Sequence, residues 1–314
     1  MQSVKNAWSG LQHVKKLAVY ALGGNALQTP DGANNGSSQI MARVMSDIID
    51  LLEMDWSVVI THGNGPQVGY LLSLDKEMAH GLDSWVGATQ GMIGHELSLN
   101  LKAILQRRRR PERTAVMVTR VRVDSDDVAF SQPTKPVGPV LSAELVMSAD
   151  WDIAQTIHGP RRVVASPAPL EILELEVIKR LVELQAVVVC GGGGGIPVIH
   201  NGEHFVGVPA VIDKDLMSSR LALDLDAHAL IITTAADAIY TDFGEEHATA
   251  HRFLSHEQLQ TMKEDGQFPP GSMAPKVKAL LEFSRQSDEC KSILCAPGSV
   301  LDALRGEAGT TIIP

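Results

Sequence analysis

The chain has 314 residues, of which 44% are apolar, 20% charged and only 4% aromatic, a composition typical of a globular protein. With so few aromatic side chains and a formal net charge of −10, we expect no nucleic-acid partner, and an anionic substrate has to be held by a local group of cations. Three scattered cysteines do not suit a disulfide framework or a zinc site, and no stretch looks like a secretory signal or reaches the ~18 apolar residues of a membrane span, so we expect a cytoplasmic protein without membrane contact.

The first part of the chain alternates apolar runs with stretches of helical periodicity. The apolar runs predict three strands, over residues 17–22, 57–61 and 114–118. The periodic stretches predict three helices, over residues 36–54, 66–80 and 90–109. Because alternating strands and helices form parallel sheets with right-handed crossovers, the expected fold class is α/β.

Residues 120–165 interrupt this alternation. The stretch contains many aspartates, prolines and glycines, has little periodicity, and is too long for a connecting loop without a role of its own. We interpret it as an inserted flap or small protruding subdomain. The alternation then resumes, and it predicts strands over 186–190, 229–233 and 292–295 and helices over 169–184, 214–226, 255–265 and 274–287.

Glycine follows three of the predicted strands. Five consecutive glycines, 191–195, come directly after an apolar run, while Gly23 and Gly24 follow the first strand and residues 63–65 follow the second. Glycine costs roughly 0.5–1 kcal/mol relative to alanine in regular structure, so such runs occur where other atoms approach the backbone closely. Since ligands of α/β proteins bind at the carboxyl ends of strands, we expect these loops to form one crevice for anionic groups.

Three lysines stand in contexts that suit phosphate binding. Lys214 lies between two aspartates at the start of a predicted helix, although an exposed first turn, where aspartates are favoured anyway, explains this position equally well. Lys276 follows a proline in a turn that opens a helix, and the free N–H groups of such an end bind anions. Lys135 is framed by prolines that restrict the backbone of the flap.

Familiar nucleotide and catalytic motifs are absent from the sequence. It holds no G-x-x-x-x-G-K-[ST], no G-x-G-x-x-G at the first glycine loop, no nucleophile elbow and no paired-histidine zinc motif. His62 is the one histidine in a glycine loop, and a lone imidazole is more often a structural hydrogen-bonding group than a base. The glycine strings are therefore not a nucleotide fingerprint of either familiar kind.

Eight sequence strings taken together identify a family. In chain order they are ALGGNAL (21–27), THGNGPQVG (61–69), TQGMIGHEL (89–97), PTKPVGP (133–139), RRVVASPAP (161–169), GGGGIPV (192–198), VIDKDL (211–216) and PGSMAPKV (270–277). In content and order they resemble the carbamate kinases of the amino-acid kinase fold family, over nearly the whole chain beyond residue 16. The first strand also has no lysine before Gly23, which distinguishes it from acetylglutamate and aspartate kinases.

The resemblance implies a three-layer αβα sandwich with a mainly parallel open sheet and a small protruding subdomain. It implies a single amino-acid kinase domain over residues 17–314, after an N-terminal extension of residues 1–16. An N-lobe of about 17–200, which includes the flap of about 120–165, would bind carbamate or carbamoyl phosphate. A C-lobe of about 201–314 would bind ATP or ADP. Homodimers formed through the N-lobe are also expected.

The activity that the resemblance implies is reversible phosphoryl transfer between ATP and carbamate, which gives ADP and carbamoyl phosphate and runs toward ATP in catabolism. Because this transfer depends on positioning and charge neutralisation, catalysis is assigned to Lys135, Lys214, Lys276 and Asp215, the last orienting lysines rather than acting as a base. Substrate and phosphate contacts, in part through backbone N–H groups, are assigned to Gly23, Gly24, Asn25, Gly63, Asn64, Gly65, Gly192, Gly193 and Gly194. The expected nucleoside pocket comprises Thr234, Asp237, Tyr240 and Met273.

Mg²⁺ is expected to arrive with the nucleotide and to keep mostly water ligands, because it dehydrates reluctantly, so no protein metal site is expected. Two alternatives stay open: an amino-acid kinase relative that acts on another small carboxylate or carbamate, and a non-catalytic nucleotide-binding paralogue. Lys135 in its proline frame favours a small acceptor. The presence of all four charged residues argues against the paralogue.

Overall fold

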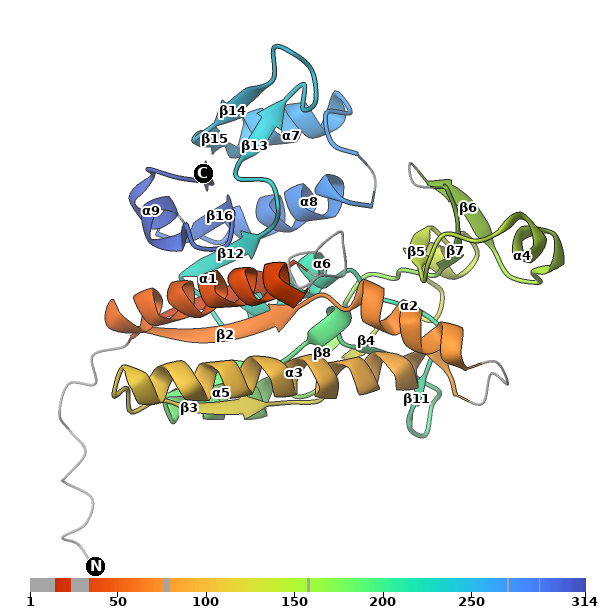
Figure 1. The fold of residues 1–314 in the computed structure, drawn as a ribbon, viewed down its shortest axis with the longest axis horizontal. Helices are drawn as coiled ribbons and strands as arrows, with labels where there is room; N and C mark the ends of the chain where they lie inside the picture. The colour runs from red at the N-terminus through yellow and green to blue at the C-terminus, as the bar shows by residue number, and fades with distance from the viewer. Residues whose placement is uncertain (1–14, 24–33, 76–79, 157–158, 270, 288) are drawn as a thin grey trace, which may run out of the picture.

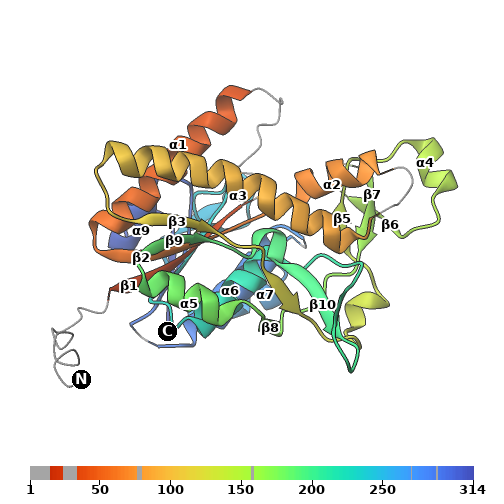
Figure 2. The same cartoon turned by 90° about the horizontal axis from the view of Figure 1, so that it is seen from below.

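The computed structural model describes residues 15–23, 34–75, 80–156, 159–269, 271–287 and 289–314. Its centre is an eight-stranded sheet with helices on both faces, and a small subdomain projects from one side (Figures 1 and 2). The strands lie in the order β15-β17-β16-β12-β1-β2-β9-β3. Their bounds are Lys16–Leu22 (β1), Trp56–His62 (β2), Arg113–Val116 (β3), Ala186–Val189 (β9), Ala229–Thr233 (β12), Phe253–Ser255 (β15), Lys291–Cys295 (β16) and Thr310–Ile313 (β17).

The sheet is mainly parallel, as predicted. Its neighbouring strands from β16 through β12, β1, β2 and β9 to β3 all pair in parallel. At the other edge, β17 pairs antiparallel with β16, and β15 follows β17 in parallel. The central strand β1 therefore receives hydrogen bonds from both neighbours, and its carboxyl end lies in the middle of the sheet edge.

Two helical layers cover the sheet (Figure 2). One face carries α1 (Asn34–Glu53), α3 (Leu82–Arg107) and α9 (Val300–Arg305), and the other carries α5 (Leu175–Glu183), α6 (Lys214–Asp224), α7 (His256–Glu264) and α8 (Met273–Ser284). Successive residues of a strand point to opposite faces. Tyr20 and Leu22 of β1 accordingly pack with the first layer, and Val19 and Ala21 with the second. The architecture is the expected three-layer αβα sandwich.

Smaller sheets extend this body. One is four-stranded, in the order β11-β10-β4-β8, and consists of Phe205–Gly207 (β11), Ile196–His200 (β10), Arg120–Arg122 (β4) and Glu171–Ile172 (β8). Another is a two-stranded antiparallel sheet of Ile239–Thr241 (β13) and Thr249–His251 (β14). β4 falls within the predicted flap, yet it pairs in parallel with β10 of the body. The projecting part therefore begins further along the chain than residue 120.

The protruding subdomain is a three-stranded antiparallel sheet in the order β5-β7-β6 (Figure 1). It consists of Lys135–Val137 (β5), Ile153–Thr156 (β6) and Gly159–Val164 (β7), with α4 (Ala143–Ser148) at its outer end and a short 3-10 turn, Val128–Phe130, before it. Val137 and Val164 pack with Val68 of α2 (Gly65–Leu74), Val86 of α3 and Val211. This cluster fixes the inner end of β5 against the body.

Several predicted boundaries differ from the observed ones. α3 begins at Leu82 rather than at residue 90, because Leu82 and Val86 already belong to its buried face. α5 begins at Leu175 rather than at 169, because Glu171 and Ile172 pair with β4. α2 ends at Leu74, and residues 76–79 of that predicted helix lie outside the described residues.

The ends and the cysteines add three observations. Residues 1–14 of the predicted extension lie outside the described residues, and Lys16 already belongs to β1. Among the helices described, none combines the length and the apolar character that crossing a membrane requires. The three cysteines are free, and burial raises the pKa of the Cys190 thiol to about 12, so this thiol stays protonated.

Candidate active site

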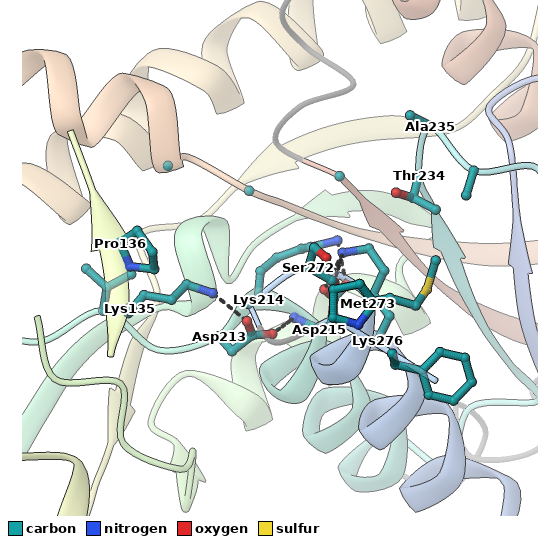
Figure 3. Close-up of a pocket in the computed structure, with 18 of the residues that line it drawn as sticks. Lys135, Pro136, Asp213, Lys214, Asp215, Thr234, Ala235, Ser272, Met273 and Lys276 are labelled. Carbon is teal, nitrogen blue, oxygen red and sulfur yellow. Dashed lines mark hydrogen bonds and ion pairs between the residues drawn. The ribbon is translucent and has the colours of Figure 1, made fainter. Parts of the chain in front are cut away.

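A cavity of about 320 Å³ opens at the carboxyl ends of three central strands. Gly23 follows β1, Gly63 follows β2 and Thr234 follows β12, and all three line it. The flap contributes Lys135 to Val137, and the segments around the starts of α6 and α8 complete the wall. The predicted crevice at the strand ends is therefore present, with the flap on one side and the α8 region on the other (Figure 3).

The start of α6 places two charged side chains inside this cavity. Asp213 caps the helix, because its Oδ1 accepts hydrogen bonds from the backbone N–H of Asp215 at 2.9 Å and of Leu216 at 3.4 Å. The first helical residue, Lys214, is only 8% exposed, and Asp215 is 3% exposed. The alternative interpretation of Lys214 as part of an exposed first turn is therefore wrong.

Asp215 binds two lysines at once. Its Oδ1 lies 2.7 Å from Nζ of Lys214, and its Oδ2 accepts a hydrogen bond from Nζ of Lys276 at 3.1 Å (Figure 3). Lys276 stands in the first turn of α8 and also donates to the backbone carbonyl of Ser272 at 3.1 Å. The helix starts of α6 and α8 thereby bring two ammonium groups to one carboxylate.

Burial and charge shift the pKa values of this cluster. Burial lowers the pKa of Lys214, and the charge of Asp215 opposes that effect. Burial alone would raise the pKa of Asp215, but the ammonium groups of Lys214 and Lys276 hold it at about 2. Nζ of Lys214 lies 2.7 Å from Oδ1 of Asp215. Because an ammonium has three N–H donors, Lys214 can bind this carboxylate and still donate to another acceptor.

The third lysine reaches the cavity from the flap. Nζ of Lys135 on β5 lies 2.5 Å from Oδ2 of Asp213. Lys135, Lys214, Asp215 and Lys276, the four predicted catalytic residues, therefore line one cavity. Asp213 also lines the cavity, although it was not among the predicted site residues. The sequence did mark it, because it is the first carboxylate of an Asp-Lys-Asp string at a helix start.

Most of the run of five glycines, 191–195, packs against other parts of the chain. Phosphate contacts were predicted for three of these glycines, Gly192, Gly193 and Gly194, and of the three only Gly193 lines the cavity. A Cβ on Gly192 would come within 2.4 Å of the His62 ring, and a Cβ on Gly194 within 2.2 Å of the backbone oxygen of Ile212. The prediction of a close approach is confirmed, but for Gly192 and Gly194 the approaching atoms belong to the chain itself. These two glycines are not cavity residues.

The first two glycine loops also differ in part from the prediction. The backbone N–H of Gly23 donates to the carbonyl of Thr233 at 3.1 Å, and that of Gly63 donates to the carbonyl of Leu22 at 3.0 Å. Both residues line the cavity, but neither N–H group is available to a phosphate, because each extends a strand ladder by one bond. Gly24 and Asn25 lie outside the described residues.

Gly65 begins α2 and lines the cavity, with open space where a Cβ would stand. The helix start directs its first backbone N–H groups toward this end. Asn64, just before it, donates from Nδ2 to Oγ1 of Thr89 at 2.8 Å, which ties the loop to α3. Gly65 is thus the predicted glycine best placed to receive an anion from the α2 side.

The surroundings of His62 suit the structural, hydrogen-bonding role that a lone imidazole more often has. It is buried, and its Nδ1 lies 3.0 Å from the backbone oxygen of Gly63. Burial and the nearby charge of Lys214 lower its pKa to about 4, even though the hydrogen bond with Gly63 opposes this. The imidazole is therefore neutral at physiological pH.

The opposite end of the cavity is apolar and aromatic. Thr234, Tyr240 and Met273 line it as predicted, together with Phe243 and Phe268. The ring centroids of Tyr240 and Phe243 lie 5.4 Å apart in a T-shaped, edge-to-face arrangement. Phe243 was not predicted as a site residue, because one exposed phenylalanine in a loop gives no signal in the sequence.

Asp237 is not a lining residue, which corrects its predicted place in the nucleoside pocket. Its Oδ1 accepts a hydrogen bond from the Tyr240 hydroxyl at 2.7 Å. Asp237 therefore meets the cavity only through Tyr240, whose ring it orients.

Carboxylates that could hold a metal do not gather here. Within the described residues, no three His, Cys, Asp or Glu side chains form a group that could bind a metal ion. The cavity carboxylates Asp213 and Asp215 are each paired with lysine. Their oxygens are thus already engaged by cations of the protein.

Comparison with known proteins gives consistent matches over almost the whole chain. The model of the amino acid kinase family matches residues 16–295. A carbamate kinase of Clostridium perfringens is 39% identical over 311 residues, which cover 94% of this chain and 99% of the relative. A carbamate kinase of Halobacterium salinarum is 38% identical over 306 residues, covering 94% and 98%.

A solved structure matches the fold equally well. The carbamate kinase from Giardia lamblia bound to AMP-PNP superposes with a TM-score of 0.85 at 32% identity, over 96% of this chain and 99% of that one. The matched family region includes every residue that lines the cavity.

Proposed function

Because the chain belongs to the amino acid kinase family, and within it to the carbamate kinases, we propose that it transfers a phosphoryl group reversibly between ATP and carbamate, with ADP and carbamoyl phosphate as the other pair. One observation carries this proposal. Lys135, Lys214 and Lys276 come from three separate segments of the chain and converge on a single cavity. The three ammonium groups outnumber the two carboxylates, Asp213 and Asp215, that pair with them, so the cavity keeps a local excess of positive charge for a polyphosphate in a protein of net charge −10.

The geometry suits a reaction that needs positioning more than proton transfer. Phosphoryl transfer spreads charge over the equatorial oxygens, and fixed cations stabilise that charge as it develops. Lys214 and Lys276 would contact the β- and γ-phosphates, and Asp215 would hold both ammonium groups in place. Lys135 would contact the carbamoyl phosphate side. Carbamate is already an anionic nucleophile, so the neutral His62 is not required as a base.

The two ends of the cavity differ in a way that suits the two substrates. The aromatic end, with Tyr240, Phe243 and Met273, offers an apolar surface for a nucleoside. The flap end, with Lys135 and the start of α2 at Gly65, offers charge and N–H donors for a small anion. We propose that the phosphoryl group moves between them, over Lys214.

Mg²⁺ is proposed as the nucleotide's companion rather than as a resident ion. Both cavity carboxylates are paired with lysines, so the donor set does not fit a protein-held metal. Mg²⁺ usually keeps several waters and binds to substrate phosphates, which needs no protein cage. We expect EDTA to stop turnover, and the dialysed protein to contain much less than one Mg²⁺ per chain by elemental analysis.

The deciding experiment is a coupled assay of ATP formation from ADP and carbamoyl phosphate. We propose this direction as the physiological one, and we expect ATP to appear at a rate that depends on both substrates. Binding of ADP without ATP formation would favour a non-catalytic paralogue. Turnover with another small acyl phosphate in place of carbamoyl phosphate would favour the related-kinase alternative.

We also propose a homodimer and a cytoplasmic location. Val116 at the edge strand β3 and Met92 and Leu99 on α3 are exposed apolar side chains, and Gly94 of α3 lies directly against Val116. These exposed apolar side chains near the edge of the sheet support a contact between two copies. Light scattering should give twice the 33.8 kDa of one chain, and cell fractionation tests the location.

A further inference from the structure

The flap-borne lysine has a carboxylate of its own. Nζ of Lys135 lies 2.5 Å from Oδ2 of Asp213, a pair that joins positions 78 residues apart. Lys214 and Lys276 share the neighbouring Asp215 instead. Figure 3 shows Lys135 extended from β5 toward the start of α6, where the dashed line meets Asp213. This contact therefore joins the flap to the start of α6.

The Asp213 side chain is held in place, and its negative charge is offset by the start of α6. Its Oδ1 caps α6 through the N–H groups of Asp215 and Leu216, which leaves Oδ2 for Lys135. Its side chain is only 10% exposed. The two N–H donors and the positive end of the helix dipole offset its charge. The carboxylate cannot turn toward solvent without leaving the start of α6 uncapped.

The other end of the Lys135 side chain is fixed as well. Lys135 pairs with Val164 across the flap sheet, and Val137, two residues along the same face of β5, is buried beside Val68 and Val211. Protein contacts therefore hold both the backbone and the ammonium of Lys135. A side chain anchored at both ends loses little further freedom when an anion binds.

We propose that Asp213 is a positioning residue that docks the ammonium of Lys135 and thereby holds the flap over the cavity; this rests on the proposed function. An ammonium has three N–H donors, and Asp213 uses one of them, so Lys135 can contact a carbamoyl phosphate oxygen without leaving Asp213. Asp213 repels an anionic substrate, but the start of α6 already offsets its charge. The attraction between the substrate and the positioned ammonium of Lys135 therefore exceeds this repulsion.

The first test is the Asp213→Asn substitution, which removes the charge and keeps an N-cap of equal quality. We expect the KM for carbamoyl phosphate to rise roughly fivefold, the size expected for a partly buried ion pair, with kcat and the KM for ADP within about twofold. In a Lys135→Ala background, the same substitution should change the KM by less than about twofold. An equal rise in both backgrounds would mean that Asp213 acts only through α6, and would overturn the proposal.

The second test does not require activity. We expect amide hydrogen exchange in β5 and β7 to be faster in Asp213→Asn and in Lys135→Ala than in the wild type, by similar factors. The matched control is Glu171→Gln, which removes the exposed ion pair with Arg122 at 2.8 Å and should leave flap exchange unchanged. Unchanged exchange of the flap amides in both Asp213→Asn and Lys135→Ala would refute the proposal that Asp213 holds the flap through Lys135. If exchange is faster in both variants but the wild type makes no ATP, the contact between Asp213 and Lys135 still holds the flap and the proposed function is wrong.

Discussion

Replacement of Lys276 by methionine isolates the role of charge in the cavity. Nζ of Lys276 lies 3.1 Å from both Oδ2 of Asp215 and the carbonyl of Ser272, in the first turn of α8. Methionine keeps an unbranched apolar stem of similar length and removes the ammonium. We expect kcat to fall by about 10²–10³, which corresponds to about 2.7–4 kcal/mol of lost transition-state stabilisation for one preorganised group.

Stability should change much less than activity. Asp215 keeps its ion pair with Lys214 at 2.7 Å, so the substitution leaves no buried carboxylate alone. A cation in the first turn of a helix also opposes the helix dipole by about 0.3–1 kcal/mol, and its removal offsets part of the lost ion pair. We therefore expect the free energy of unfolding to change by about 1 kcal/mol or less, and Tm by about 3 °C or less.

The assay is ATP formation from ADP and carbamoyl phosphate, with substrate titrations that separate kcat from KM. The matched control is Lys278→Met on the same helix. Lys278 is about half exposed and lies 3.9 Å from Glu282, so its loss should leave kcat within about twofold of the wild type. If folded Lys276→Met protein kept a kcat within tenfold of the wild type, the argument from charge neutralisation would be refuted.

Three further substitutions test other parts of the site. In Gly193→Ala, the new Cβ would meet the Asn64 side chain at 2.2 Å at a backbone φ of +66°, so both Tm and kcat should fall, measured by thermal unfolding and by turnover. Because the pKa of His62 is about 4 in the folded protein and near 6.5 when unfolded, its neutral form stabilises the fold above pH 6.5 and this contribution is lost as the pH falls. Urea unfolding should therefore show that the free energy of unfolding falls between pH 7 and pH 4.5 by about 2 kcal/mol less in His62→Gln than in the wild type. An equal fall in both proteins would mean that burial of a neutral His62 does not cause the pH dependence. In Asp215→Asn, the loss of the carboxylate charge lowers the pKa of Lys214 further, so the alkaline limb of the profile of kcat against pH should move to lower pH than in the wild type.

The layered fold could be predicted because its signals are local. Strand β12 occupies the predicted residues 229–233 without change, and the ends of β1 and β2 carry the glycine loops that the pattern indicates. Edge elements are less predictable. β17 has four residues and β15 three, and strands this short acquire their pairing from the sheet rather than from their own periodicity.

The site was partly predictable for a similar reason. Lys214 and Lys276 stand at helix starts that the sequence marks with aspartate and proline, and the structure places both in the cavity. A local sequence pattern does not show which residues from distant parts of the chain pack against a given position. The glycine run suggested a ligand, but His62 and Ile212 fill the space above Gly192 and Gly194.

The position of β1 in the middle of the sheet has a consequence for synthesis on the ribosome. One of its two neighbours, β12, pairs Ala229 with Ala18, so the partner is translated more than two hundred residues after β1 itself. At about 5–20 residues per second, β1 waits on the order of 10–40 s with one of its sides unpaired. During that interval the nascent polypeptide exposes an apolar strand edge, so its exposure to aggregation is set by the distance along the chain between two neighbouring strands.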